Sequence, residues 1–191
     1  MSNTTVMWQA MQWPAIEHFT LSDNNGLRNA CGNITGVIGV QPFALQYEIE
    51  MTGNWKVSWF HIRSLAPHGR EIKLTSDLAG HWFDLAGNHI EAFHSCLDID
   101  ISLTPFTNTL PVKRLSFQPG EKKVVNMLYI KLPEFELQQV QQHYTCLDEQ
   151  HYRYERYDQH TVAFSADLPF DDDGLVTDYP GIFKRIYPEK Y

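Results

Sequence analysis

Short segments in which apolar and polar residues alternate dominate this chain, and turn residues separate them. The side chains of a β-strand point alternately to its two faces, so this pattern indicates strands with one buried face. The clearest example joins YEIEM (residues 47–51) to WKVSW (residues 55–59) through the turn sequence TGN. These segments predict an antiparallel hairpin whose rings share one face.

The two faces of this hairpin determine the register that we expect. A two-residue turn would set a glutamate against Trp59 and mix the apolar and polar faces. A three-residue loop ending at Asn54 instead pairs Met51 with Trp55 and Tyr47 with Trp59. Because a one-residue slip would expose a whole apolar face, the sequence predicts the longer loop, with Asn54 in the left-handed conformation.

The same alternation predicts further strands and leaves room for a single helix. Strands are expected at residues 71–74, 80–92 with a turn at 86–87, 97–103, 123–131 and 152–166 with a turn at 158–160. Residues 135–144 fit a strand or a helix equally well. Thr104 as a cap and Pro105 at the first helical position predict a helix to Leu115, which Pro111 shortens or breaks. Many strands and one helix favour an antiparallel roll over a parallel sheet.

Aromatic residues recur along the two hairpins and are the first candidates for a binding site. They are Tyr47, Trp55, Trp59, Tyr152, Tyr154 and Phe164. Such rings either fill a core or line a cavity that admits an apolar ligand. Tyrosine and tryptophan also carry an O–H or N–H group that can form a hydrogen bond. Two pairs of adjacent basic residues stand out in this acidic chain: Lys113 with Arg114, and Lys184 with Arg185. They are candidates to bind an anionic or hydroxylated head group.

Length and charge narrow the class of protein. A chain of 191 residues with 43% hydrophobic residues predicts a single domain over residues 1–191. A net charge of −8 opposes a phosphate backbone, so no nucleic-acid partner is expected, and no apolar stretch is long enough for an integral membrane segment. Three scattered cysteines (Cys31, Cys96 and Cys146) and the lack of a signal-peptide pattern predict free thiols and a cytoplasmic location.

Two carboxylates on one predicted strand offer a catalytic alternative. Asp98 and Asp100 point to the same side, about 7 Å apart, and that spacing lies in the range of the carboxylate pair of inverting glycosidases. The other interpretation is a solvated polar face of an amphipathic strand.

The histidines do not predict a metal site. The chain holds nine of them but no H-E-x-x-H motif. His89 and His94 are five residues apart, which puts them on opposite sides of a strand. No motif for a cofactor occurs, and we expect none.

Two long segments resemble a bacterial family. They are LDIDISLTPFTNTLPVKRL (residues 97–115) and FSADLPFDDDGLVTDYPGIFKR (residues 164–185), and QQVQQHYTCL (residues 138–147) also fits. The chain resembles, over most of its length, the family named for glycolipid binding, formerly a domain of unknown function. The resemblance implies an antiparallel spiral β-roll of about fifteen short strands wrapped around one helix, often as a homodimer. It marks Arg114, Tyr179 and Arg185 as signature positions.

Together these observations predict a non-enzymatic protein that holds a glycolipid or related amphiphile inside a β-roll. The aromatic stripes would line the cavity, and Arg114, Tyr179 and Arg185 would contact the head group. One alternative is a hydrolase, of the glycosidase or esterase kind, that acts on such a lipid with Asp98, Asp100 or a histidine. The other is a structural or dimerisation module with a solid core.

Overall fold

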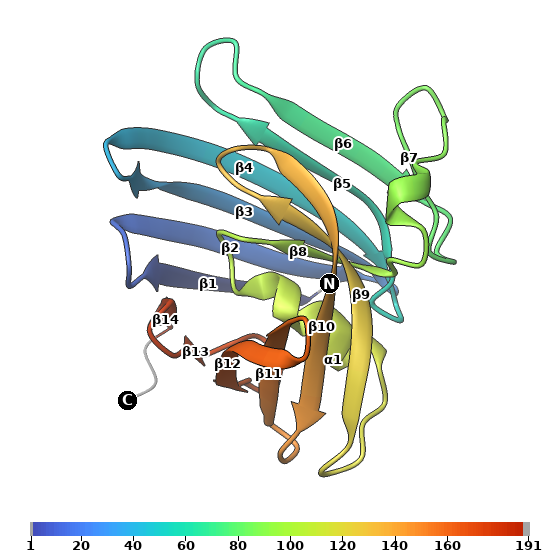
Figure 1. The fold of residues 1–191 in the computed structure, drawn as a ribbon. Helices are drawn as coiled ribbons and strands as arrows, with labels where there is room; N and C mark the ends of the chain where they lie inside the picture. Colours follow the sequence, from blue (N-terminus) through green and yellow to red (C-terminus); the bar gives the residue numbers. More distant parts are fainter. Residues whose placement is uncertain (1, 189–191) are drawn as a thin grey trace.

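The computed structural model describes residues 2–188, which form two sheets (Figure 1). The nine-stranded sheet has the order β13-β14-β1-β2-β3-β4-β5-β6-β7, and the five-stranded sheet has the order β12-β11-β10-β9-β8. The strands of the larger sheet are β1 (Ser2–Ala10), β2 (Ala15–Asn24), β3 (Leu27–Ile38), β4 (Gln41–Thr52), β5 (Val57–Ser64), β6 (Glu71–Ser76), β7 (Trp82–Phe83), β13 (Asp178–Tyr179) and β14 (Phe183–Tyr187). Those of the smaller sheet are β8 (Asp98–Ile101), β9 (Lys122–Lys131), β10 (Glu136–Cys146), β11 (His151–Asp158) and β12 (Thr161–Pro169).

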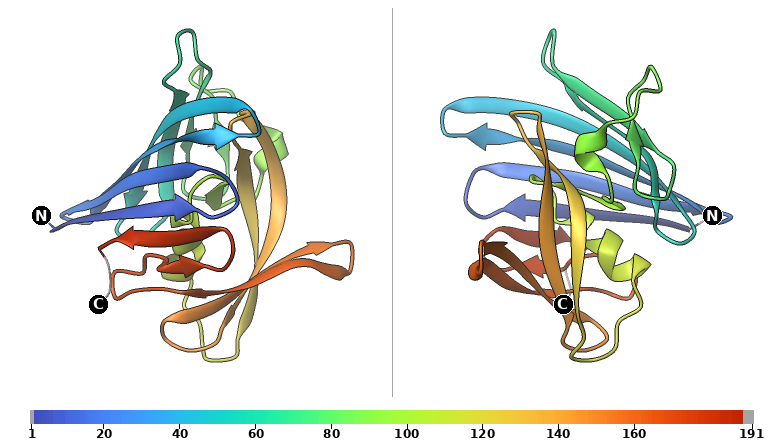
Figure 2. Two further views of the ribbon diagram at one scale, coloured as in Figure 1. Left: turned by 90° about the vertical axis from the view of Figure 1, so that its left-hand side faces the viewer. Right: turned by 45° about the vertical axis from the view of Figure 1, so that its right-hand side comes forward.

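The two sheets enclose a short helix. Strands β1 to β7 follow one another as an antiparallel meander, and the chain returns at its end to add β14 and β13 beside β1. In Figure 1 the long β9–β10 hairpin runs across the strands of the larger sheet, and the views in Figure 2 place α1 (Thr109–Arg114) between the sheets. The structure is therefore mainly β, a roll around one helix, as predicted.

The helix begins where the sequence predicts it. The Thr104 hydroxyl accepts the Phe106 N–H at 3.1 Å, and a 3₁₀ turn, η2 (Phe106–Asn108), leads into α1. Pro111 lies in the first turn of α1, where its missing N–H costs no hydrogen bond. The prediction of one short helix is confirmed.

The register predicted for the first hairpin is wrong. Tyr47 pairs with Ile62, and Glu50 pairs with Trp59. The loop begins one residue later than predicted, because the Thr52 N–H donates to the Lys56 carbonyl across it, and a bulge then adds one residue to β5. Each later residue of β5 therefore moves to the opposite face, and Trp59 lies on the outer face beside Glu50 rather than with Tyr47. The left-handed residue of the loop is Trp55, with φ 61°, rather than the asparagine before it.

Strand β8 departs from the antiparallel pattern, because it pairs with β9 in parallel. It is buried on both faces: Ile99 and Ile101 are fully covered, and so is Asp98. The interpretation of this segment as a strand with a solvated face is therefore wrong. The ambiguous segment 135–144 is resolved as strand β10.

His89 and His94, which were expected on opposite sides of one strand, lie on either side of a short helix. Residues 84–87 form the predicted turn, in which Gly87 N–H donates to the Asp84 carbonyl at 3.0 Å. The chain then leaves the sheet for a 3₁₀ helix, η1 (Glu91–Phe93), so His89 and His94 do not belong to one strand. The prediction of their opposed placement is wrong, because the helix turns the chain between them.

Buried side chains form two clusters, a larger one beneath the nine-stranded sheet and a smaller one between β9–β12 and the C-terminal strands. Trp13 packs against both. Cys31, Cys96 and Cys146 are free, as predicted, and the last two are buried. Among residues 2–188, no helix combines the length and apolar character needed to cross a membrane.

Candidate functional site

A pocket lies at the seam where the five-stranded sheet meets β13 and β14. Its volume is about 210 Å³. This exceeds the roughly 150 Å³ of a cavity that holds benzene and is below the roughly 300 Å³ at which drug-sized sites begin. The lining residues are Asp100, Ile101, Ser102, Thr104, Asn108, Tyr129, Gln138, Val140, Gln142, Tyr154, Arg156, Phe164, Tyr179, Ile182 and Phe183.

Three rings from three successive elements form the aromatic wall of this pocket. The centroids of Tyr154 and Phe164 lie 5.9 Å apart, those of Phe164 and Tyr179 6.1 Å, and those of Tyr154 and Tyr179 6.2 Å. Burial raises the pKa of the Tyr154 and Tyr179 phenols well above the usual range. Both phenols therefore stay protonated and offer a hydroxyl that can donate to a ligand.

A polar wall adjoins Tyr154 and Phe164 on the same face of the five-stranded sheet. The Asp100 carboxylate accepts the Thr107 hydroxyl at 3.0 Å and the Gln142 amide at 2.5 Å. The Tyr144 hydroxyl continues this network, 3.1 Å from Gln142 Oε1 and 2.9 Å from Asn108 Oδ1. Burial raises the pKa of Asp100, and the hydrogen bonds from Gln142 and Thr107 oppose that rise. The pocket thus presents fixed hydrogen-bonding groups beside a group of aromatic rings.

A second polar group lies directly behind the pocket, in the core of the larger sheet. The Tyr47 hydroxyl donates to Glu17 Oε1 at 2.5 Å and lies 3.4 Å from the hydroxyl of Thr104, which lines the pocket. Burial raises the pKa of Glu17 to about 8, although the hydrogen bonds from Tyr47 and Thr104 lower it. Gly32 makes room for this arrangement, since a Cβ there would clash with the Tyr47 ring.

The structure brings together some of the predicted ligand-binding residues. Tyr154, Phe164 and Tyr179 line the pocket itself. Tyr47 reaches it only through Thr104, because its own ring is buried in the core.

The other predicted positions lie outside the pocket. Trp55 stacks with the Arg28 guanidinium at 4.7 Å, and the Lys73 ammonium lies 5.3 Å from the centre of the Trp59 ring on the outer face. Tyr152 packs against Phe170 at 5.6 Å.

The two arginines that were predicted to contact the ligand instead form ion pairs and hydrogen bonds within the protein. Arg114 reaches back from α1 to Asp98, with Nε 2.9 Å from Oδ1 and Nη2 2.6 Å from Oδ2. Arg185 donates to Asp171 at 2.5 Å and to the carbonyls of Leu175 and Val176 at 2.9 Å. Asp98 therefore faces an arginine, whereas Asp100 faces the pocket.

Sequence reasoning missed the polar wall. Gln142 is 1% exposed although its residue type is usually solvated, and Asn108 is nearly as buried. A signal was present: Gln138, Val140 and Gln142 alternate with their neighbours along β10 and therefore share one face. The parallel pairing of β8 with β9, which brings Asp100 to this face, had no signal in the local pattern.

The comparisons with known proteins agree with this architecture. The family model described as "Putative glycolipid-binding" matches residues 5–185. The chain belongs to this family. The crystal structure of a DUF1089 family protein from Pseudomonas aeruginosa is similar at a TM-score of 0.81 and 35% sequence identity, covering 90% of this chain and 92% of that chain. None of the curated proteins matches the chain. The family resemblance drawn from the two long segments is confirmed.

Proposed function

We propose that this protein binds a glycolipid or related amphiphile in the seam pocket and does not convert it chemically. The observation that carries the proposal is that an aromatic wall (Tyr154, Phe164 and Tyr179) adjoins a polar wall built around Asp100 and Gln142 in one pocket. A sugar ring has apolar faces and a hydroxylated edge, so it can stack on one wall and hydrogen-bond to the other. Membership of a family described as glycolipid-binding supports the same ligand class.

The pocket volume limits which part of the ligand it takes. About 210 Å³ admits one substituted six-membered ring or a short length of acyl chain. The remainder of an amphiphile must then lie outside the pocket. The pocket favours the head group as the enclosed part, because the Tyr154 and Tyr179 hydroxyls, which can donate to a ligand, would meet no acceptor on an acyl chain.

The arrangement of the carboxylates supports binding over hydrolysis. Glycoside hydrolysis by an acid and base pair needs both carboxyl groups to face the scissile bond. Asp100 does face the pocket, but both oxygens of Asp98 are held by Arg114. We therefore propose a non-catalytic role.

Native mass spectrometry of gently purified protein, together with lipid extraction, tests this proposal. A retained amphiphile, or binding of a monohexosyl diacylglycerol from a glycolipid panel, is the expected result. Tyr179→Phe removes one hydroxyl without changing the ring and should weaken binding by about 2- to 10-fold. Phe164→Ala removes one of the three rings of the aromatic wall and should weaken binding by a similar factor.

Trp59→Ala is the matched control, since this ring lies on the outer face of the larger sheet. It should leave affinity unchanged. Protein that is consistently empty and has no affinity for the panel would reject the proposal. Equal loss of binding in Trp59→Ala and Phe164→Ala would show that the ligand does not bind in the seam pocket.

We further propose that the protein acts as a homodimer in the cytoplasm. The free cysteines support a reducing compartment. Light scattering on the eluting peak of a sizing column should give twice the 22.2 kDa mass of the chain.

A further inference from the structure

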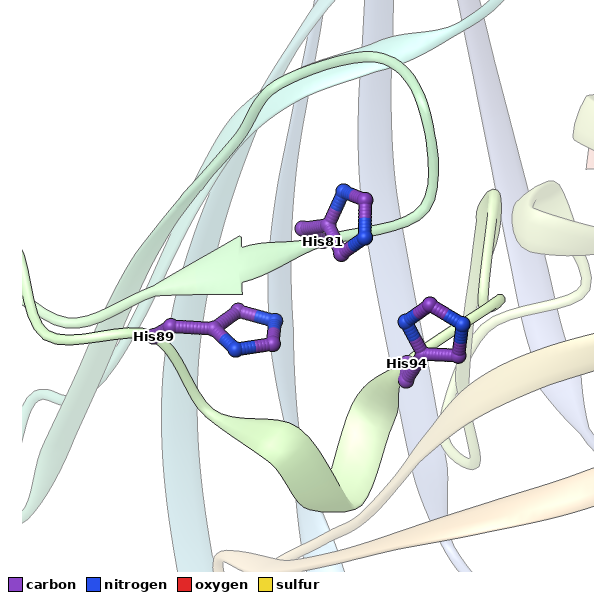
Figure 3. Close-up of side chains that lie close together, drawn as sticks. All are labelled: His81, His89 and His94. Carbon is purple, nitrogen blue, oxygen red and sulfur yellow. The ribbon is translucent and has the colours of Figure 1, made fainter.

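Three histidines that are scattered in the sequence converge on one point of the surface (Figure 3). His81 precedes β7, His89 bridges to Phe83 in that strand, and His94 follows η1. One ring nitrogen from each lies within 4.8 Å of the other two. The His81 ring centroid lies 5.2 Å from that of His89 and 5.0 Å from that of His94. In Figure 3 the three rings surround a common space.

The backbone holds the three positions in place without help from the rings. Ile90 N–H donates to the Trp82 carbonyl at 2.8 Å, which anchors the segment after His89 to β7. Ser95 N–H donates to the Gly80 carbonyl, also at 2.8 Å, which brings the residue after His94 next to the residue before His81. Main-chain hydrogen bonds therefore bring the backbone positions of the three histidines together.

Two of the rings are oriented by carboxylates. His81 Nδ1 lies 2.6 Å from Asp77 Oδ2, and His89 Nδ1 lies 3.2 Å from Glu91 Oε2. A carboxylate at Nδ1 keeps the proton on that nitrogen and leaves Nε2 with a free lone pair. Metal-binding histidines in proteins are arranged in this way, with the second ring nitrogen donating to a carboxylate or carbonyl.

We propose that His81, His89 and His94 bind one divalent transition-metal ion, with Zn²⁺ as the best match, through three imidazole nitrogens. An all-imidazole ligand set suits zinc, copper or nickel and does not suit Mg²⁺ or Ca²⁺, which take oxygen ligands. Zn–N bonds of about 2.0–2.1 Å require the three nitrogens to approach to about 3.4 Å. The rings close this gap by small rotations, because His89 and His94 are exposed side chains with room to move.

The fourth coordination position faces solvent and is open to water or to an anionic ligand, as in sites with three protein ligands. The site is separate from the seam pocket, since no residue lines both. Its neighbours connect it to the smaller sheet: Gln139 of β10 donates to the His94 carbonyl at 3.1 Å, and Asn126 of β9 donates to the Ser95 hydroxyl at 2.9 Å. A bound ion would therefore join the β7 edge of the larger sheet to a segment that rests on β9 and β10.

Isothermal titration of the full, chelator-treated chain with ZnCl₂ tests the proposal. The wild type should bind one equivalent of Zn²⁺, and Co²⁺ in its place should give the visible absorption of a four-coordinate site. His94→Ala should abolish the one-to-one binding step. His151→Ala is the matched control, because His151 is also a surface histidine held by a carboxylate, at 2.8 Å from Asp148, but lies outside the cluster.

A second variant tests whether Asp77 orients the His81 ring for metal binding without disturbing the fold. In Asp77→Asn the Oδ1 atom can still accept the N–H groups of Ala79 and His81, so the loop keeps its hydrogen bonds. The new amide NH₂ would face His81 Nδ1 and move the ring proton to Nε2, the nitrogen that the metal needs. Zn²⁺ affinity should fall by about 10- to 100-fold while circular dichroism stays unchanged. Absence of binding in the wild type, or binding that survives in His94→Ala, would overturn the proposal.

Discussion

Glu17 shows how a single residue departs from what its type suggests. A glutamate is almost never fully buried without a partner, yet Glu17 is 2% exposed, and only one of its two oxygens has a hydrogen bond. Its pKa of about 8 keeps it protonated at neutral pH, and a neutral acid costs far less to bury than a carboxylate. The sequence did hold a signal, since Glu17 is in phase with Phe19 and Leu21 along β2.

This buried acid makes stability depend on pH. Burial raises the pKa of Glu17 from 4.5 to about 8, so between these values the folded chain keeps a proton that the unfolded chain releases. The free energy of unfolding should therefore fall as pH rises from about 5 to 8. At about 1.4 kcal/mol per pH unit the loss is at most roughly 5 kcal/mol.

Glu17→Gln removes this titration while keeping a carbonyl oxygen for the Tyr47 hydroxyl. Urea unfolding of both proteins at pH 5, 6.5 and 8 measures the difference. The variant should lose less stability than the wild type across this range. Parallel stability curves for the two proteins would show that Glu17 does not titrate there.

At the scale of elements, an ion pair joins the helix to the sheet. Arg114, at the end of α1, is 11% exposed, and its partner Asp98 in β8 is fully buried. Removing one member of such a pair leaves a charge without compensation, at a cost of about 3–5 kcal/mol. The pair therefore fixes how the helix sits against the parallel β8–β9 edge.

Arg114→Met should lower the free energy of unfolding by about 3–5 kcal/mol. Adding Asp98→Asn to this variant should recover part of the loss, because the buried charge is then gone. Thermal or urea unfolding of the two variants measures both effects. If Arg114 contacts ligand instead of stabilising the fold, Arg114→Met will lower ligand affinity and leave stability unchanged.

Predictions for elements succeeded where local pattern decides the outcome. The turn at 159–160, the capped helix after Thr104 and the alternation of β12 all depend on neighbours in sequence. The register of β4 and β5 could not be predicted, because neither the position of the loop nor the bulge beside it shows in the alternation of the residues. Once present, the bulge moved Trp59 out of the core.

At the scale of the whole molecule, the two buried clusters share Trp13 and the roll encloses α1 between them. We propose that residues 1–191 form one domain that unfolds as a unit. Circular dichroism and tryptophan fluorescence should then report the same transition midpoint. Two separate transitions would show that the sheets unfold independently.

The sequence by itself determined the β-rich fold, the short capped helix, the free thiols and the family, because each depends on local alternation, turn residues or long matching segments. Only the tertiary structure decided which rings meet at the seam pocket, that Asp98 faces Arg114, and that three histidines converge. These features join residues far apart in the chain. Their placement follows from sheet register and from the folding of one sheet over the other, which local pattern does not encode.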